Sequence, residues 1–215
     1  MAISDSYATI DDYRSRLGRS DNGADTQIEH DLLAVSRYID RITGYTATGF
    51  SKDASDTTRV FTVPHANRND RRLWIDPLSA APTSVTVDTD FDGDFTDETA
   101  LTLTQFTGDI LYEPSNYAAG PEPRPIQCLV LTTWNSTLTR WPSGAAVQVV
   151  GKFGWPAVPE MIRSACIELT GILRLESPRA TEQITEIGEA TRMSGDAQKI
   201  LHGLTRTYRK VSVLI

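Results

Sequence analysis

The spacing between apolar residues changes twice along the chain, and this change limits the folds that the chain can adopt. Between Asp25 and Gly44 apolar side chains recur every three or four positions, which predicts a helix with one buried face formed by Ile28, Leu32, Val35, Ile39 and Ile42. From about residue 46 to 157 the spacing falls to two, and Thr, Val, Pro and Gly become frequent, as in short strands joined by turns. From Pro159 onward the helical spacing returns. The chain therefore predicts an α+β fold.

We expect the helices at both ends to pack together as one helical body that carries an inserted antiparallel β lobe, either a small sheet or a barrel. The predicted parts are N-terminal helices in 1–45, the β lobe in 46–157, C-terminal helices in 158–203 and a docking arm in 204–215. A brief helix is expected over 10–17, where Thr9 and Asp12 form a capping-box pattern. Strands are expected at 59–63, 72–75, 84–87, 101–104, 110–112, 126–132 and 146–153. A last helix would contain Leu204 and Tyr208, whereas the segment 179–193 is ambiguous.

Composition narrows the class of protein. Hydrophobic residues make up 40% and charged residues 23% of the sequence, which is ordinary for a soluble globular protein. No apolar run approaches the roughly 20 residues that a membrane helix needs, and the first residues lack the basic and apolar pattern of a signal peptide. Cys128 and Cys166 are widely spaced among apolar neighbours, so we expect buried thiols that stay reduced in a cytoplasm. We expect no membrane association.

The sequence contains no recognisable catalytic pattern. Its three histidines, His30, His65 and His202, are scattered, without a Cys or His at metal-ligand spacing. The sequence has neither a Gly-x-Ser-x-Gly nucleophile motif nor a glycine-rich phosphate-binding loop. We predict that the protein is not an enzyme and uses no cofactor.

A strongly acidic stretch lies between two predicted strands. Residues 88–98 hold six acids and no base, and the spacing of their first carboxylates, followed by Gly93, matches the start of a calcium-binding loop. The match ends at the twelfth position, which is Thr99 where a bidentate Glu belongs. We interpret the stretch as a solvated hairpin tip in which Asp and Gly supply the turn, so no metal site is predicted. The alternative is a weak cation site formed by Asp88, Asp90, Asp92 and Asp94.

The C-terminal end has the opposite charge. Residues 192–215 contain five bases and one acid, and they finish in the largely apolar run Val211-Ser-Val-Leu-Ile215. Basic surfaces that bind DNA usually have a larger excess of Lys and Arg, whereas a basic and apolar end suits docking on a protein. We therefore expect the end of the chain to bind another protein.

Two tryptophans, Trp141 and Trp155, are each followed by proline and bracket a predicted strand. The proline holds the backbone of each Trp in an extended conformation. The simplest interpretation is that both rings close the core of the β lobe near the helices. The alternative is that they are rigid aromatic anchors at a subunit interface.

Four segments occur along the chain in an order that is typical of one family. The clearest is 151–170, GKFGWPAVPEMIRSACIELT, in which a last strand leads through Gly-Trp and Val-Pro into a long helix. The others are YIDRITGYTATGF at 38–50, the Asp-rich hairpin, and LTRTYRKVS at 204–212. Together these segments resemble the head–tail connector proteins of tailed bacteriophages, which are also called adaptor or head completion proteins.

The resemblance implies a structural virion protein of the neck, where the head meets the tail, assembled in the host cytoplasm. Such proteins bind the portal protein after DNA packaging and form a homo-oligomeric ring, usually a dodecamer. The ring extends the channel, through which genomic DNA passes without sequence recognition, and contacts the next connector (stopper) or a tail protein. The C-terminal segment docks on the portal, which assigns that role to Thr205, Arg206, Tyr208, Arg209, Lys210, Val211, Val213, Leu214 and Ile215. The alternative function is a calcium-stabilised, β-rich binding module, such as an adhesin-like surface domain.

Overall fold

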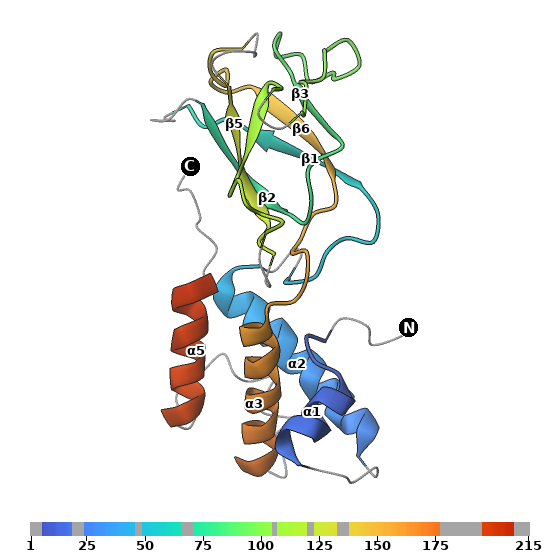
Figure 1. The fold of residues 1–215 in the computed structure, drawn as a ribbon, viewed down its shortest axis with the longest axis vertical. Coiled ribbons are helices and arrows are strands. Elements are labelled where there is room, and N and C mark those ends of the chain that lie inside the picture. The colour runs from blue at the N-terminus through green and yellow to red at the C-terminus, as the bar shows by residue number, and fades with distance from the viewer. Residues whose placement is uncertain are drawn as a thin grey trace. The chain divides into compact units, whose positions relative to one another are not determined.

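The computed structural model describes residues 6–18, 24–45, 49–65, 71–104, 107–119, 123–132, 138–176 and 195–208. The chain divides into two compact units (Figure 1). A helical unit combines the chain up to Phe50 with the chain from Val158 through the last helix, and a β unit spans Ser51 to Ala157. The predicted α+β fold, a helical body with an inserted β lobe, is confirmed. The β unit begins at residue 51, where 46 was expected.

The helical unit begins with two helices whose ends are set by local sequence. At the start of α1 (Ile10–Leu17) the Thr9 hydroxyl accepts a hydrogen bond from the Asp12 N–H, and the Asp12 carboxylate accepts one from the Thr9 N–H. Gly18 ends α1 with a left-handed φ of 62°. Gly44 ends α2 (Asp25–Thr43) in the same way, with φ of 86°. Both predicted helices are confirmed. They could be predicted because caps and apolar spacing are local signals.

α2 packs against the later helices of its unit, α3 (Glu160–Glu176) and α5 (Gly195–Tyr208). The predicted face of α2 is buried except at its end, where Ile42 is half-buried. Arg174 of α3 donates a hydrogen bond to the buried Asp31 carboxylate of α2 at 2.6 Å. Since an unpaired carboxylate would be destabilising at this depth, the ion pair ties α2 to α3 at a defined position.

The β unit contains two three-stranded antiparallel sheets within the described residues. One has the strand order β1-β6-β3, formed by Thr57–Thr62, Ala146–Gly151 and Ser84–Val87. The other has the order β2-β5-β4, formed by Arg72–Leu78, Ile126–Leu131 and Ile110–Glu113. Both sheets contribute to one buried core, which includes Val147 and Val149 from β6 and Leu129 and Leu131 from β5. The sequence predicted a small sheet or a barrel. The structure has a pair of small sheets around a shared core.

One predicted strand, 101–104, is wrong. The segment that follows the acidic loop meets β3 at a bridge between Thr86 and Ala100 and where the Leu101 N–H donates to the Val85 carbonyl at 2.8 Å, but it does not continue as a strand. The next residues are held in a local turn instead, because the Asp109 carboxylate accepts from the Thr102 N–H at 2.7 Å. Apolar alternation alone therefore does not identify a paired strand.

Candidate functional site

The acidic stretch 88–98 is a loop of successive turns held by its own carboxylates. Asp88 is only 3% exposed and accepts hydrogen bonds from the N–H groups of Phe91 (2.6 Å) and Gly93 (3.1 Å). The later carboxylates repeat this pattern by accepting from N–H groups within the loop; they are Asp90, Asp92, Asp94 and Glu98. These bonds are the turn chemistry that Asp supplies in loops. Phe91, at the exposed end of the first turn, adopts a left-handed φ of 67°.

Two groups of carboxylates in this loop come close enough to hold a cation between them. Within each group the oxygens lie within 4.8 Å of one another; the groups are Asp88 with Asp90 and Glu98, and Asp90 with Asp92 and Asp97. Asp94, a sequence candidate, belongs to neither group, whereas Asp97 was not expected. Because Asp88, Asp90, Asp92 and Glu98 already accept backbone N–H groups, hydrogen bonding within the loop explains the placement of these four carboxylates.

The charges of the loop act on one another. A hydrogen bond from the Asp92 N–H lowers the pKa of Asp90, but desolvation and the neighbouring carboxylates of Asp92, Asp97 and Asp88 outweigh it and raise that pKa above its ordinary value. Hydrogen bonds from Thr89 lower the pKa of Glu98. The close packing of carboxylates in this loop therefore shifts the pKa values of Asp90 and Glu98 in opposite directions.

The two tryptophans that the sequence offered as interface anchors are buried. Trp141 is 1% exposed, belongs to the core of the β unit, and donates from its indole nitrogen to the Arg71 carbonyl at 2.9 Å. Trp155 is 8% exposed. The core interpretation agrees with the burial of both residues, and a role at a subunit interface stays a prediction.

The proposed docking residues divide between a helix and the end of the chain. Thr205, Arg206 and Tyr208 lie in α5, whereas Arg209, Lys210, Val211, Val213, Leu214 and Ile215 lie outside the described residues. The Tyr208 ring packs edge-on against Phe50, with ring centroids 5.6 Å apart. Leu204 is buried one turn earlier. Tyr208 therefore belongs to the packing of the helical unit, and a docking role for the residues from Thr205 to Ile215 stays a prediction.

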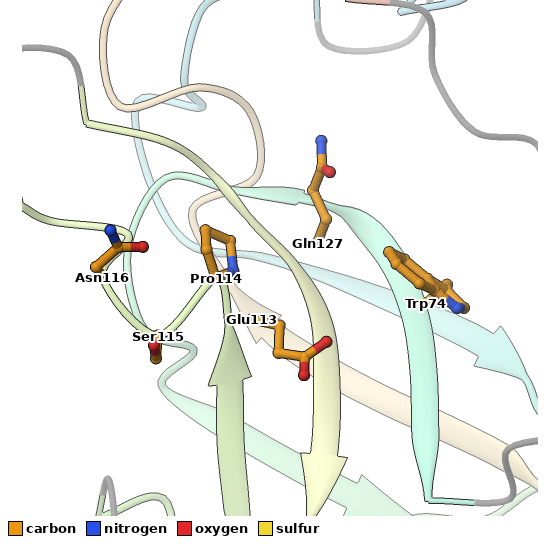
Figure 2. Close-up of a pocket in the computed structure, with 6 residues that line it drawn as sticks. All are labelled: Trp74, Glu113, Pro114, Ser115, Asn116 and Gln127. Atoms are coloured by element: carbon orange, nitrogen blue, oxygen red, sulfur yellow. The ribbon is translucent and has the colours of Figure 1, made fainter.

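A further site, on the β2-β5-β4 sheet, was missed from the sequence. An open pocket of about 420 Å³ is lined by Trp74, Glu113, Pro114, Ser115, Asn116 and Gln127 (Figure 2). Trp74 is 48% exposed, although its neighbours Leu73 and Ile75 are buried. The period-two pattern contained this signal, because it places Trp74 on the face opposite to these two apolar residues.

Comparison with known proteins finds no matching family model and no matching curated protein. None of the helices in the described ranges is both long and apolar enough to cross a membrane.

Proposed function

We propose that this protein is a head–tail connector of a tailed bacteriophage, an adaptor ring that binds the portal after DNA packaging and joins the head to the tail. The observation that carries the proposal is the way the helical unit is built. Its helices come from both ends of the chain, and the β unit lies between them in sequence. The segments 38–50 and 151–170, on which the resemblance rests, are the two places where the chain leaves and re-enters that unit.

The packing of α5 supports a docking role for the residues that follow it. Leu204 is buried and Tyr208 contacts Phe50, so α5 is fixed to the helical unit at its end. The exposed Arg206 adds a base beside the basic residues Arg209 and Lys210 of the sequence. A basic and apolar segment that starts from a fixed helix suits docking into a groove of a neighbouring protein.

Charge also fits a protein that surrounds DNA without binding it. The chain has a net charge of −7, and the loop 88–98 concentrates six of its acids. Negative surfaces repel the phosphate backbone, so DNA can pass without adhering. In this proposal the protein recognises no nucleotide sequence, has no catalytic activity, and works in the virion neck as a homo-oligomeric ring.

The experiment that tests the proposal uses the full chain and the portal protein encoded in the same genome. We expect the full chain to bind assembled portal and to form a ring visible by cryo-electron microscopy. Deleting residues 209–215 keeps α5 intact, so the truncated chain should melt at the same temperature but lose portal binding. Lys199→Glu is the control, because Lys199 is an exposed base of α5 outside the arm.

Two results would count against the proposal at different levels. Portal binding that survives the deletion contradicts the docking arm. Failure of the full chain to bind portal or to form a ring on it contradicts the connector function itself.

The calcium-stabilised binding module is the second candidate, and the two carboxylate groups of the acidic loop favour it. A ligand that binds only the folded chain raises its melting temperature by mass action. A calcium-dependent rise that disappears in Asp90→Asn would support this candidate, since Asp90 belongs to both groups. An unchanged melting temperature in millimolar calcium would remove it.

A further inference from the structure

The pocket beside Trp74 has no part in the connector proposal and offers a distinct chemistry. Trp74 lies in the middle of a strand and is 48% exposed, so part of a large apolar side chain faces water. Trp74 borders a pocket whose other members are mostly polar (Figure 2). An aromatic side chain beside several hydrogen-bonding groups suits a ligand that has both an apolar face and polar edges.

Strand register sets the width of the pocket. Trp74 of β2 and Glu113 of β4 are both paired with Cys128 of the central strand β5, so the three side chains belong to the same face of the sheet. Two strand spacings separate the outer pair, which is about 10 Å. Cys128 lies between them and is fully buried, and burial raises the pKa of its thiol to about 12. The buried thiol is therefore unreactive, and Cys128 is not among the residues that line the pocket.

The polar groups around the pocket can both donate and accept hydrogen bonds. Asn116 and Gln127 contribute amides, and Ser115 contributes a hydroxyl. Glu113 accepts a hydrogen bond from Arg72 at 2.7 Å, which holds its carboxylate in place and offsets its charge. The lining therefore suits an uncharged ligand that carries several hydroxyl groups.

We propose that this pocket binds a neutral sugar residue of a glycan. The apolar C–H face of a sugar ring packs on the Trp74 ring, and the hydroxyls at its edge bond to the amides and to Glu113. A phosphate would meet the Glu113 carboxylate, and Arg72 already pairs with that group. A proline-rich peptide would require a groove lined by several aromatic rings, and this pocket contains one.

Binding is tested with the full chain and neutral oligosaccharides of glucose, galactose, mannose and N-acetylglucosamine, by isothermal titration calorimetry. We expect at least one series to bind, and Trp74→Ala to weaken that binding by about tenfold. Gln127→Ala should weaken it as well, whereas Trp74→Phe, which keeps a ring, should retain part of it. The matched control is Phe91→Ala, which removes another exposed aromatic ring, in the acidic loop. The melting temperature of each variant checks that it folds.

Three outcomes would overturn the sugar site. They are no binding of any series at millimolar concentration, equal binding by Trp74→Ala and the unmodified chain, and loss of binding in Phe91→Ala to the same degree. The connector proposal is tested by a different measurement, portal binding, so its failure can be told apart from failure of the sugar site. If Trp74→Ala abolishes ring assembly and no sugar binds, the pocket is a protein contact and the sugar proposal fails.

Discussion

The phenol of Tyr7 donates a hydrogen bond to the buried carboxylate of Asp40. The same oxygen accepts a hydrogen bond from the Phe50 N–H at 2.8 Å, so one hydroxyl serves two buried groups where the chain leaves the helical unit. Tyr7→Phe removes the hydroxyl, so both the Asp40 carboxylate and the Phe50 N–H lose this hydrogen-bond partner. We expect the free energy of unfolding to fall by about 1–3 kcal/mol, measured by urea denaturation.

Tyr13 provides the matched control for this substitution. Its side chain is also fully buried in the helical unit, but its hydroxyl has no hydrogen-bond partner among the described residues. Removing a buried hydroxyl without a partner does not break a bond, so Tyr13→Phe should leave stability unchanged or raise it. Equal losses in Tyr13→Phe and Tyr7→Phe would contradict the role assigned to the Tyr7 hydroxyl.

Asp40 should make stability depend on pH. Burial raises the pKa of Asp40 above its ordinary value, although the Tyr7 hydrogen bond and the Arg37 charge act in the opposite direction. The folded chain then holds the proton more tightly than the unfolded chain, so this contribution to stability is lost as pH rises through the interval between the two pKa values. Asp40→Asn does not titrate. Its stability relative to the unmodified chain should therefore rise with pH above about 4, in urea unfolding between pH 4 and 7. A constant difference would contradict the raised pKa.

The ion pair between Asp31 and Arg174 should contribute more to the free energy of unfolding than ion pairs between exposed residues. Arg174→Ala leaves a buried carboxylate without its charged partner, and we expect a loss of about 3 kcal/mol in the free energy of unfolding. The control is Lys199→Ala, which breaks a pair with Asp196 in which both side chains are largely exposed. Such surface pairs contribute little, so this variant should unfold at the same urea concentration as the unmodified chain.

Gly154, within the segment that carries the family resemblance, should tolerate no side chain. Its φ is 112°, and a Cβ built there would lie 1.9 Å from the Ser51 carbonyl oxygen. Gly154→Ala therefore requires the backbone to move, and we expect a loss of about 3 kcal/mol. Gly93→Ala is the control, because Gly93 also has a positive φ but has no atom within 4 Å of the added Cβ. Thermal melts followed by circular dichroism should show the smaller decrease for Gly93→Ala, and equal decreases would contradict the steric argument.

Local signals predicted the helices of this protein well. The ends of α1 and α2 follow from Thr9, Gly18 and Gly44, whose effects reach only one helical turn. The strand predicted at 101–104 failed, because its alternation is compatible both with sheet pairing and with a turn closed by Asp109. Pairing depends on residues far along the chain, which the local pattern does not contain.

The candidate sites were harder to predict for the same reason. Proline after Trp141 and Trp155 restricts the backbone, but tertiary packing, which the local pattern does not contain, buries the rings. The exposure of Trp74 follows from its position between Leu73 and Ile75. The polar side of its pocket does not follow from that local pattern, because Glu113 and Gln127 come from two other strands.

The contact between Phe50 and Tyr208 sets an order of events during synthesis. The ribosome delivers the whole β unit, which ends at Ala157, before it delivers α5. The β unit can therefore fold as the chain emerges, whereas α1 and α2 must wait for helices that are made last. Until then the buried face of α2 lacks α3 and α5, and Asp31 lacks its charged partner Arg174, so the nascent helical segment exposes apolar surface to aggregation or to capture by chaperones.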